Sequence, residues 1–340
     1  MTNRLLQLIR SDHPIQRVAS DLSKRCADRA HRRLNFGGSA RFEDRQSGTE
    51  TLIIIVGGYR PKLWPYTFPR LALFLPPDAD VCLTSPGLDP LEVREMAERN
   101  GWSYLSTPDN RIARAKNHTI RRHPNAQWIV MLDEDIFLTD GMISQLRDGF
   151  ERVREEARFE PGFVAPLLNV NGHSYTVLLR LLELEEAYRA RFGELKSACM
   201  GIPAHADPEA ARWLWRNTTP LDATAERLRK LPFAYSAIPH RFSIGAMGIE
   251  RSFWQEMGGF RAALLEGHIG RHERVLCEYC TNTSRPGVLV HTAFAGHFAF
   301  YTQIESMERM LAERPEVFAL PDQVTERYPV KQSLAEPGAR

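Results

Sequence analysis

The sequence predicts an α/β fold in which helices flank a mainly parallel β-sheet. Short apolar runs recur along the chain at 52–56, 80–85, 102–106 and 128–133, and a further strand candidate spans 162–170. Amphipathic stretches separate these runs. This rhythm is typical of βαβ units, because a strand buried on both faces reads as an unbroken apolar run and a helix returns the chain to the next parallel strand.

The intervals between the apolar runs carry helix signals. We expect helices over 89–99, which opens with Asp-Pro, and over 109–121, where Asp or Asn can cap the first turn. A third helix is predicted over 141–157, and the strongest helical pattern covers 176–192. Beyond it, 193–243 is rich in Pro and aromatic residues, which suits loops and short helices that wall a binding cleft.

Composition narrows the class of protein. The 340 residues are 43% hydrophobic and 25% charged, which is ordinary for a globular chain with a substantial core. The net charge of +2 argues against a nucleic-acid partner. No run of about 18 uncharged apolar residues occurs, the first apolar run is too short for a signal peptide, and the cysteines are scattered. We therefore expect a cytoplasmic protein with reduced thiols.

Residues 1–50 are expected to form an N-terminal helical appendage. They contain ten Lys/Arg and six Asp/Glu, a net charge of +4. Such a segment could contact an anionic membrane surface or an acidic partner. A solvated helix face is the simpler explanation, because no strongly apolar opposite face accompanies the charge.

Three consecutive acids, Asp133, Glu134 and Asp135, follow the apolar run 128–132. In an open parallel sheet, ligands bind beyond the carboxyl ends of the strands. Adjacent carboxylates repel one another there unless a cation neutralises them, and Mg²⁺ or Mn²⁺ prefers carboxylate oxygens. In extended backbone Asp133 and Asp135 point the same way, so both can serve one ion that binds a diphosphate. Acids in a solvated turn are the alternative.

Four separated stretches resemble a known family. Thr51–Tyr59 reads as a first strand that ends in Gly-Gly-Tyr-Arg, and Asn110–Asn117 is similar to an Asn-x4-Ala-Arg-Asn helix in which Lys116 replaces Arg. The Asp-x-Asp strand is the third, and Gly245–Phe260, with an aromatic ahead of Gly-Gly-Phe, is the fourth. Together they resemble the nucleotide-diphospho-sugar transferases of the GT-A fold, especially glycosyltransferase family 2. The GT-A fold has a Rossmann-like, mainly parallel sheet.

The resemblance spans residues 51–300 and implies that different parts of the chain bind the donor and the acceptor. It implies that 51–170 form the half that binds the nucleotide sugar and 171–300 the half that binds the acceptor, with 301–340 as a C-terminal helical tail. The donor-binding residues that it implies are Gly57, Tyr59, Arg60, Asn110, Lys116, Asp133 and Glu134. The neighbouring arginines of the Asn110 stretch equally suit a solvated helix face, and only Lys116 gains support from the motif.

The resemblance also implies a catalytic base and metal ligands. The family has an acidic pair near a helix start, where this chain has His272-Glu273, so Glu273 is the candidate base for the acceptor hydroxyl. A carboxylate that merely interacts with the positive end of a helix is the alternative. A late histidine often completes the metal sphere beside Asp133 and Asp135, and His291 and His297 are the candidates. A hydrogen-bonded role in or near the core is the alternative for either histidine.

Some expected signals are missing. The family often has an acidic motif where this chain reads Leu83-Thr84-Ser85-Pro86, which leaves the donor base open. The chain has neither a Gly-x4-Gly-Lys-Ser/Thr loop nor a Gly-x-Gly-x2-Gly fingerprint, which argues against kinase-like NTPases and dehydrogenases. Cys277-x2-Cys280 has no second cysteine pair at zinc spacing and is predicted to be one turn of a packed helix.

The sequence thus predicts a metal-dependent glycosyltransferase that moves a sugar from a nucleotide diphosphate to an acceptor hydroxyl with inversion, in glycan or glycoconjugate synthesis. One alternative is a sugar-nucleotide nucleotidyltransferase, which would consume a nucleoside triphosphate and release pyrophosphate. Another is a sugar- or nucleotide-binding protein of the same fold without catalysis. Peripheral contact with the inner membrane face is compatible with each.

Overall fold

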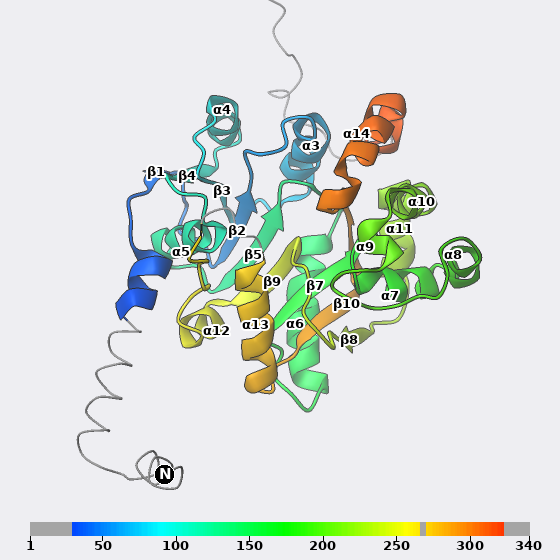
Figure 1. Cartoon of the computed structure of the whole chain (residues 1–340). Coiled ribbons are helices and arrows are strands. Elements are labelled where there is room, and N and C mark those ends of the chain that lie inside the picture. The colour runs from blue at the N-terminus through cyan, green and yellow to red at the C-terminus, as the bar shows by residue number, and fades with distance from the viewer. Residues whose placement is uncertain (1–28, 266–269, 323–340) are drawn as a thin grey trace, which may run out of the picture.

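The computed structural model describes residues 29–265 and 270–322 (Figure 1). Ten strands form one sheet in the order β1-β4-β3-β2-β5-β9-β7-β10-β6, and β8 pairs with β10. The strands are β1 Arg41–Glu43, β2 Thr51–Val56, β3 Asp80–Pro86, β4 Ser103–Thr107, β5 Trp128–Asp133, β6 Ile136–Phe137, β7 Phe163–Leu168, β8 Tyr235–Ala237, β9 Ala246–Glu250 and β10 Gly287–His297.

The long strands run in one direction. β4, β3, β2 and β5 are parallel neighbours, and β7 pairs in parallel with β10. β9 lies between these two groups and is antiparallel to both β5 and β7. The carboxyl ends of β2, β5, β7 and β10 therefore meet at one edge of the sheet, and the predicted α/β class with a mainly parallel sheet is confirmed.

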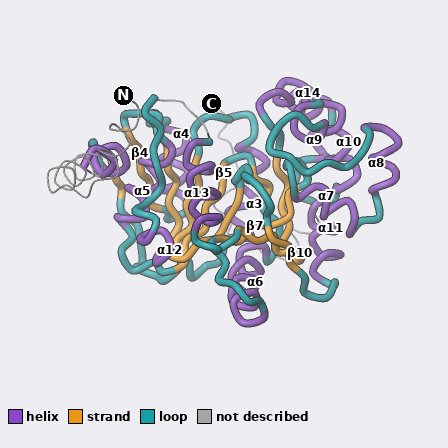
Figure 2. Tube along the Cα trace, turned by 60° about the horizontal axis from the view of Figure 1, so that its bottom comes forward, coloured by secondary structure: helices purple, strands orange, loops and turns teal. Residues whose placement is uncertain are grey.

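Helices cover both faces of the sheet, as the side chains of β2 illustrate. Ile53 and Ile55 pack in a core with α3, α4 and α6, whereas Leu52 and Ile54 belong to a second core with α5 and α7 on the other face. Figure 2 shows the helices around the strand layer. The helices are α3 Trp64–Phe74, α4 Leu91–Arg99, α5 Ile112–Arg122, α6 Met142–Glu156, α7 Ser174–Leu181, α8 Glu185–Phe192, α9 Pro203–Ala206, α10 Pro208–Thr218, α11 Leu221–Arg229, α12 Arg251–Glu256, α13 Arg271–Asn282 and α14 Ile304–Glu313.

The single long helix predicted over 176–192 is wrong, because the chain turns between α7 and α8. Glu183 has φ 62°, a left-handed conformation that ends a helix. The turn lets Tyr188 on α8 bury its ring against Tyr175 and Trp213, with ring centroids 5.4 and 5.7 Å away. Burial of this large aromatic side chain outweighs the local helix propensity.

The first described residues are tied to the sheet. Residues 29–36 are helical, and 1–28, which hold most of the predicted appendage, lie outside the described residues. β1 pairs antiparallel with β4, and the Asp80 carboxylate accepts backbone hydrogen bonds from Ser47, Gly48 and Thr49 at 2.6, 2.9 and 3.0 Å. The predicted helical appendage over 1–50 therefore does not extend through 41–49, where β1 and an irregular segment that is bound to Asp80 replace helix.

Two further predictions concern helices. Cys277 and Cys280 lie one turn apart on α13, and Cys280 is buried, so this segment is a packed helix turn as predicted. The predicted tail begins with Tyr301–Gln303 and α14, while 323–340 are not described. Within the described part of the chain, no helix is both long and apolar enough to cross a bilayer.

Candidate active site

The acid cluster lies at the carboxyl edge of the sheet. Asp133 is the last residue of β5 and is paired in register with Val56, the last residue of β2. A cavity of about 570 Å³ opens beyond these strand ends, between the loop after β2, the start of α5 and α14. Its lining includes the predicted residues Tyr59, Arg60, Asn110, Asp133, Glu134 and Asp135. The described part of the C-terminal tail contributes Tyr301, Ile304 and Glu308 to the same cavity.

Glu134 holds the loop after β2 in place. Its carboxylate accepts hydrogen bonds from the backbone N–H of Gly58 and Tyr59, at 3.0 and 2.8 Å, and from Trp64 Nε1 at 2.6 Å. Only 4% of Glu134 is exposed, and this burial raises the pKa of its carboxyl while the three donors oppose the shift. Since both oxygens serve the loop, Glu134 acts as a positioning residue rather than the direct donor ligand that the resemblance implied.

The predicted glycines let the loop approach these acids. A side chain at Gly57 would place its Cβ 3.3 Å from Glu134 Oε2, and Gly58 has φ 123°. The Tyr59 hydroxyl then lies 3.0 Å from Asn110 Oδ1 and within hydrogen-bond distance of the Pro86 carbonyl. Burial and the Glu134 charge raise the pKa of Tyr59 to about 12. These contacts join the loop to the start of α5, so Tyr59 and Asn110 form one wall of the cavity.

Asp135 lies opposite His297, the last residue of β10. Asp135 Oδ2 is 3.8 Å from His297 Nε2 and 3.3 Å from Arg60 Nε, and only 8% of the Asp135 side chain is exposed. His297 Nδ1 is 2.6 Å from the Val170 carbonyl oxygen. A carbonyl only accepts, so Nδ1 carries a proton and Nε2 is the ring nitrogen that faces Asp135.

This pair suits a small divalent cation. Adjacent ligand atoms of an octahedral Mg²⁺ lie about 3.0 Å apart, so Asp135 Oδ2 and His297 Nε2, which are 3.8 Å apart, need to approach by only about 0.8 Å to hold one ion. Among the described residues, no three His, Cys, Asp or Glu side chains are placed to hold a metal together. Two protein ligands, with water and phosphate oxygens in the other positions, are a common way to bind Mg²⁺.

Asp133 contributes charge to the same place. Its side chain is 41% exposed to the cavity, yet the surrounding protein atoms leave it poorly solvated. This desolvation and the carboxylates of Asp135, Glu273 and Glu134 raise the pKa of Asp133 to about 7, against the effect of Lys116. Lys116 on α5 is 3% exposed, and its Nζ lies 3.9 Å from Asp133 Oδ1. The site therefore combines acids that favour a cation with a buried lysine that favours an anion.

Glu273 stands in the first turn of α13. Glu273 Oε1 accepts a hydrogen bond from Ile244 N at 3.0 Å and Oε2 accepts one from Arg241 Nη2 at 3.2 Å, with 12% of the side chain exposed. Glu273 is close enough to Asp133 to raise the pKa of that carboxyl. Burial, Lys116 and Arg241 together hold the pKa of the adjacent His272 well below its ordinary value. Ile244, which binds Glu273, is followed by Gly245, whose carbonyl accepts a hydrogen bond from Asp133 N at 2.8 Å, so the candidate base lies near Asp133 but outside the lining of the cavity.

Sequence reasoning missed two contributors and placed one residue wrongly. Arg241 orients Glu273, but it lies in an irregular stretch of sequence that contains no motif. Trp64 binds Glu134, and the only hint in the sequence is that an aromatic residue follows Pro-Lys-Leu. His291 bonds to Ser236 Oγ at 3.1 Å. It stands six residues before His297 on β10, roughly 15–20 Å along a strand. The predicted metal role of His291 is therefore wrong.

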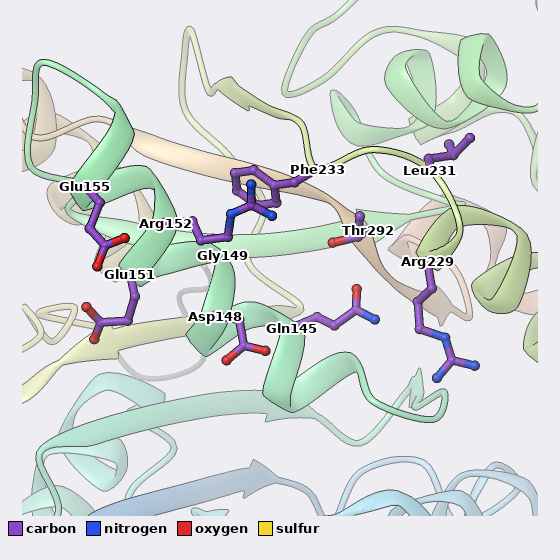
Figure 3. A pocket seen from close by; sticks show the side chains of 10 residues that line it. All are labelled: Gln145, Asp148, Gly149, Glu151, Arg152, Glu155, Arg229, Leu231, Phe233 and Thr292. Carbon is purple, nitrogen blue, oxygen red and sulfur yellow. The ribbon is translucent and has the colours of Figure 1, made fainter.

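A second cavity, of about 610 Å³, lies alongside α6 (Figure 3). Its side chains are mainly charged, and the Arg152 guanidinium lies 3.9 Å from the centre of the Phe233 ring. Figure 3 shows Glu151 and Glu155 turned away from this pair. None of the sequence-predicted site residues lines this cavity, so the candidate active site is the cavity at the strand ends.

No family model and no curated protein matches this chain. Among solved structures, it is similar to a mannosyltransferase from Pyrobaculum calidifontis in complex with GDP-Man and Mn²⁺, with 11% identity, a TM-score of 0.44, and coverage of 82% of this chain and 64% of that chain. It is also similar to GalNAc-T7 with UDP, GalNAc and Mn²⁺, with 14% identity, a TM-score of 0.43, and coverage of 82% and 54%. Both structural neighbours are nucleotide-sugar glycosyltransferases. The matched part is less than two thirds of the length of either glycosyltransferase.

Proposed function

We propose that the protein is a metal-dependent glycosyltransferase that moves a sugar from a nucleotide diphosphate to an acceptor hydroxyl with inversion. One observation carries the proposal: Glu273, an independent carboxylate from the distant helix α13, binds Ile244 N, and the adjacent Gly245 carbonyl accepts a hydrogen bond from Asp133 N at the end of β5. A cation-binding acid cluster alone would suit any nucleotide-binding protein. A second, separately oriented carboxylate is what an acid–base reaction at a bound donor requires.

Asp135 and His297 are the residues that would hold the divalent ion, with Asp133 within reach of its water shell. When bound, the ion supplies charge stabilisation for the departing nucleoside diphosphate. Arg60 and Lys116 add positive charge on the two sides of the acids, 3.3 Å from Asp135 and 3.9 Å from Asp133. These cations suit the phosphate oxygens, while Tyr59 and Asn110 wall the donor half, which we assign to residues 51–170.

Glu273 serves as the base in this proposal. Each Glu273 oxygen accepts a single hydrogen bond, one from Ile244 N and one from Arg241, so the carboxylate is oriented and keeps a lone pair on each oxygen for the proton of an acceptor hydroxyl, whereas Glu134 accepts three bonds. The hydroxyl oxygen forms a bond to the anomeric carbon as the bond from that carbon to the diphosphate breaks. Attack from the face opposite the leaving group inverts the anomeric centre, and the acceptor then lies in the half formed by 171–300.

The exposed arginines near the start of the described chain suit an anionic membrane surface. Arg29, Arg32 and Arg33 are exposed on the helix 29–36, and Arg121 and Arg122 are exposed at the end of α5, with Arg121 over the Phe36 ring of that helix. We assign peripheral contact with a cytoplasmic membrane face, in glycan or glycoconjugate synthesis, to this surface. Sedimentation with vesicles that contain anionic lipid tests it; binding equal to that of neutral vesicles would rule it out.

The test of the activity is a panel of nucleotide sugars with Mn²⁺ or Mg²⁺, assayed for hydrolysis and transfer in the full chain. We expect turnover that needs metal, and losses of at least about 100-fold in Asp135→Ala and Glu273→Gln. Asp148→Ala and Glu278→Gln, which alter exposed acids outside the site, serve as matched controls. Full turnover in both site variants would exclude the assignment, and pyrophosphate release from a nucleoside triphosphate would indicate a nucleotidyltransferase instead.

A further inference from the structure

The loop between β2 and α3 carries two cations into the cavity, and each is paired with a different acid. Arg60 Nε lies 3.3 Å from Asp135 Oδ2, and Lys62 Nζ lies 2.6 Å from Glu308 Oε2 on α14. Glu134 binds both ends of this loop, through the backbone of Gly58 and the indole of Trp64. The loop is therefore fixed at its ends, and the positions of its two cations depend on their own side-chain partners.

Arg60 and the expected metal compete for one oxygen atom. Asp135 Oδ2 is the atom nearest to both Arg60 Nε and His297 Nε2. A guanidinium stays protonated at any physiological pH, so a divalent ion at Oδ2 would be repelled by the adjacent Arg60 charge. With only 8% of the Asp135 side chain exposed, water screens this repulsion poorly.

A diphosphate resolves the conflict. Arg60 is 27% exposed and lines the cavity, so its guanidinium can turn toward a ligand there. An anion with oxygens on both sides can bind the metal through one oxygen and the guanidinium through another. The metal ion and Arg60 are then both attracted to the diphosphate, and this attraction offsets the repulsion between them.

We infer that Arg60 covers the metal-binding oxygen of Asp135 until a nucleoside diphosphate draws the guanidinium away, so that metal and nucleoside diphosphate bind cooperatively. This inference rests on the proposed function and concerns the order of binding rather than the transfer step. Coupling between two ligands is reciprocal, so the metal must strengthen nucleotide binding by the same factor that the nucleotide strengthens metal binding.

The experiment measures Mn²⁺ affinity by the electron paramagnetic resonance signal of the free ion, in the full chain, with and without UDP, GDP, ADP or CDP. In the wild type we expect Mn²⁺ to bind at least about 10-fold tighter with the preferred nucleotide than alone. In Arg60→Gln we expect Mn²⁺ alone to bind about 10-fold tighter than to the wild type, and the coupling to shrink to within about 3-fold. Arg60→Lys, which keeps the charge, should retain much of the wild-type behaviour.

Two controls separate this effect from a general change of charge. Lys62→Gln removes a cation from the same loop and cavity, but one that is paired with Glu308, so Mn²⁺ alone should bind as in the wild type. The double variant Arg60→Gln/Asp135→Ala should lose the tighter binding of Mn²⁺ alone that we expect in Arg60→Gln. Unchanged affinity for Mn²⁺ alone in Arg60→Gln, with coupling intact, would overturn the inference and leave the proposed function standing. No Mn²⁺ binding by the wild type with any of the four nucleotides would overturn both.

Discussion

His297 Nε2 faces Asp135 Oδ2 across 3.8 Å, while the opposite ring nitrogen is 2.6 Å from the Val170 carbonyl oxygen. The carbonyl binds the Nδ1 proton, so Nε2 is the ring nitrogen that shares the space in front of the Asp135 carboxylate. Asp135, just after β5, and His297, at the end of β10, are more than 150 positions apart in sequence, and they face one another at the site that we propose for the cation.

The first prediction concerns His297. His297→Gln removes the imidazole lone pair, and we expect Mn²⁺ affinity in the presence of a nucleoside diphosphate to fall by about 10- to 100-fold. Titration calorimetry measures the change. His291→Gln is the matched control, since His291 is also on β10 but bonds to Ser236 of β8 and does not line the cavity. Equal losses in the two variants would show that His297 acts through the strand and not as a ligand.

The second prediction concerns pH. The pKa of Asp133 is raised from 3.8 to about 7, so in the metal-free protein this carboxyl keeps its proton below about pH 7. Its folded-state pKa exceeds its unfolded value, so its contribution to stability is full below about pH 4 and is lost as the pH rises toward 7. A cation favours the ionised form, so Mn²⁺ affinity should rise between pH 6 and pH 8 with release of a proton.

Calorimetry in buffers of different ionisation enthalpy measures that proton release. Asp133→Asn, which cannot ionise, should bind Mn²⁺ with a flatter pH profile over the same range. If this variant keeps the wild-type slope, another group supplies the proton. His272 is unsuited to that part, since burial and its cationic neighbours Lys116 and Arg241 keep its pKa well below the ordinary value.

The third prediction concerns Glu134. Glu134→Gln keeps the shape of the side chain but replaces one acceptor oxygen by an N–H₂ group that faces backbone or indole N–H donors. We expect the free energy of unfolding to fall by about 2 kcal/mol. Nucleotide affinity should fall as well, because the loop that carries Tyr59 and Arg60 loses its anchor.

Urea denaturation and nucleotide titration measure the two effects. Glu308→Gln is the control, because its pair with Lys62 is largely solvated, at 34% and 68% exposure, and such pairs contribute about 0–1 kcal/mol. A stability loss in Glu134→Gln no larger than in Glu308→Gln would contradict the anchoring role.

The strands and the acid cluster were predictable from sequence because they depend on local pattern. A buried parallel strand reads as an apolar run, and the residues that follow it must lie at the sheet edge. Local pattern does not predict β9 and β10, because these strands pair with strands far away in sequence. It also does not predict which of His291 and His297 lies near the acids. That choice depends on how far β10 runs past the end of β7.

Two other features depend on tertiary contacts. The helical pattern over 176–192 is genuine, yet the burial of Tyr188 against Tyr175 breaks it at Glu183. Arg241 orients Glu273 from a loop whose path no local rule specifies. Glu134, in turn, belonged to the recognised acid motif, but its role in holding the loop follows only from the three donors that surround it.

The last prediction concerns Asn117, which explains why two of the sequence motifs belong together. Asn117 is fully buried, and its Oδ1 accepts hydrogen bonds from Trp254 Nε1 at 3.0 Å and from Phe260 N at 2.9 Å. Its Nδ2 donates to the carbonyls of Asn35 and Phe260 at 3.0 and 2.8 Å. The end of the Asn110–Asn117 motif thus binds both ends of the Trp254–Phe260 segment.

Asn117→Ala would leave four buried polar groups without this partner, and we expect the free energy of unfolding to fall by about 3 kcal/mol or more. Asn117→Asp keeps both acceptor bonds but sets a carboxylate against the Asn35 and Phe260 carbonyls, so it should also destabilise. Asn125→Ala, which loses one 3.3 Å bond at an exposed position, should cost less than about 0.5 kcal/mol. Chemical denaturation ranks the three variants. A small effect of Asn117→Ala would mean that water replaces the side chain, and the two motifs would then be joined by hydrophobic packing alone.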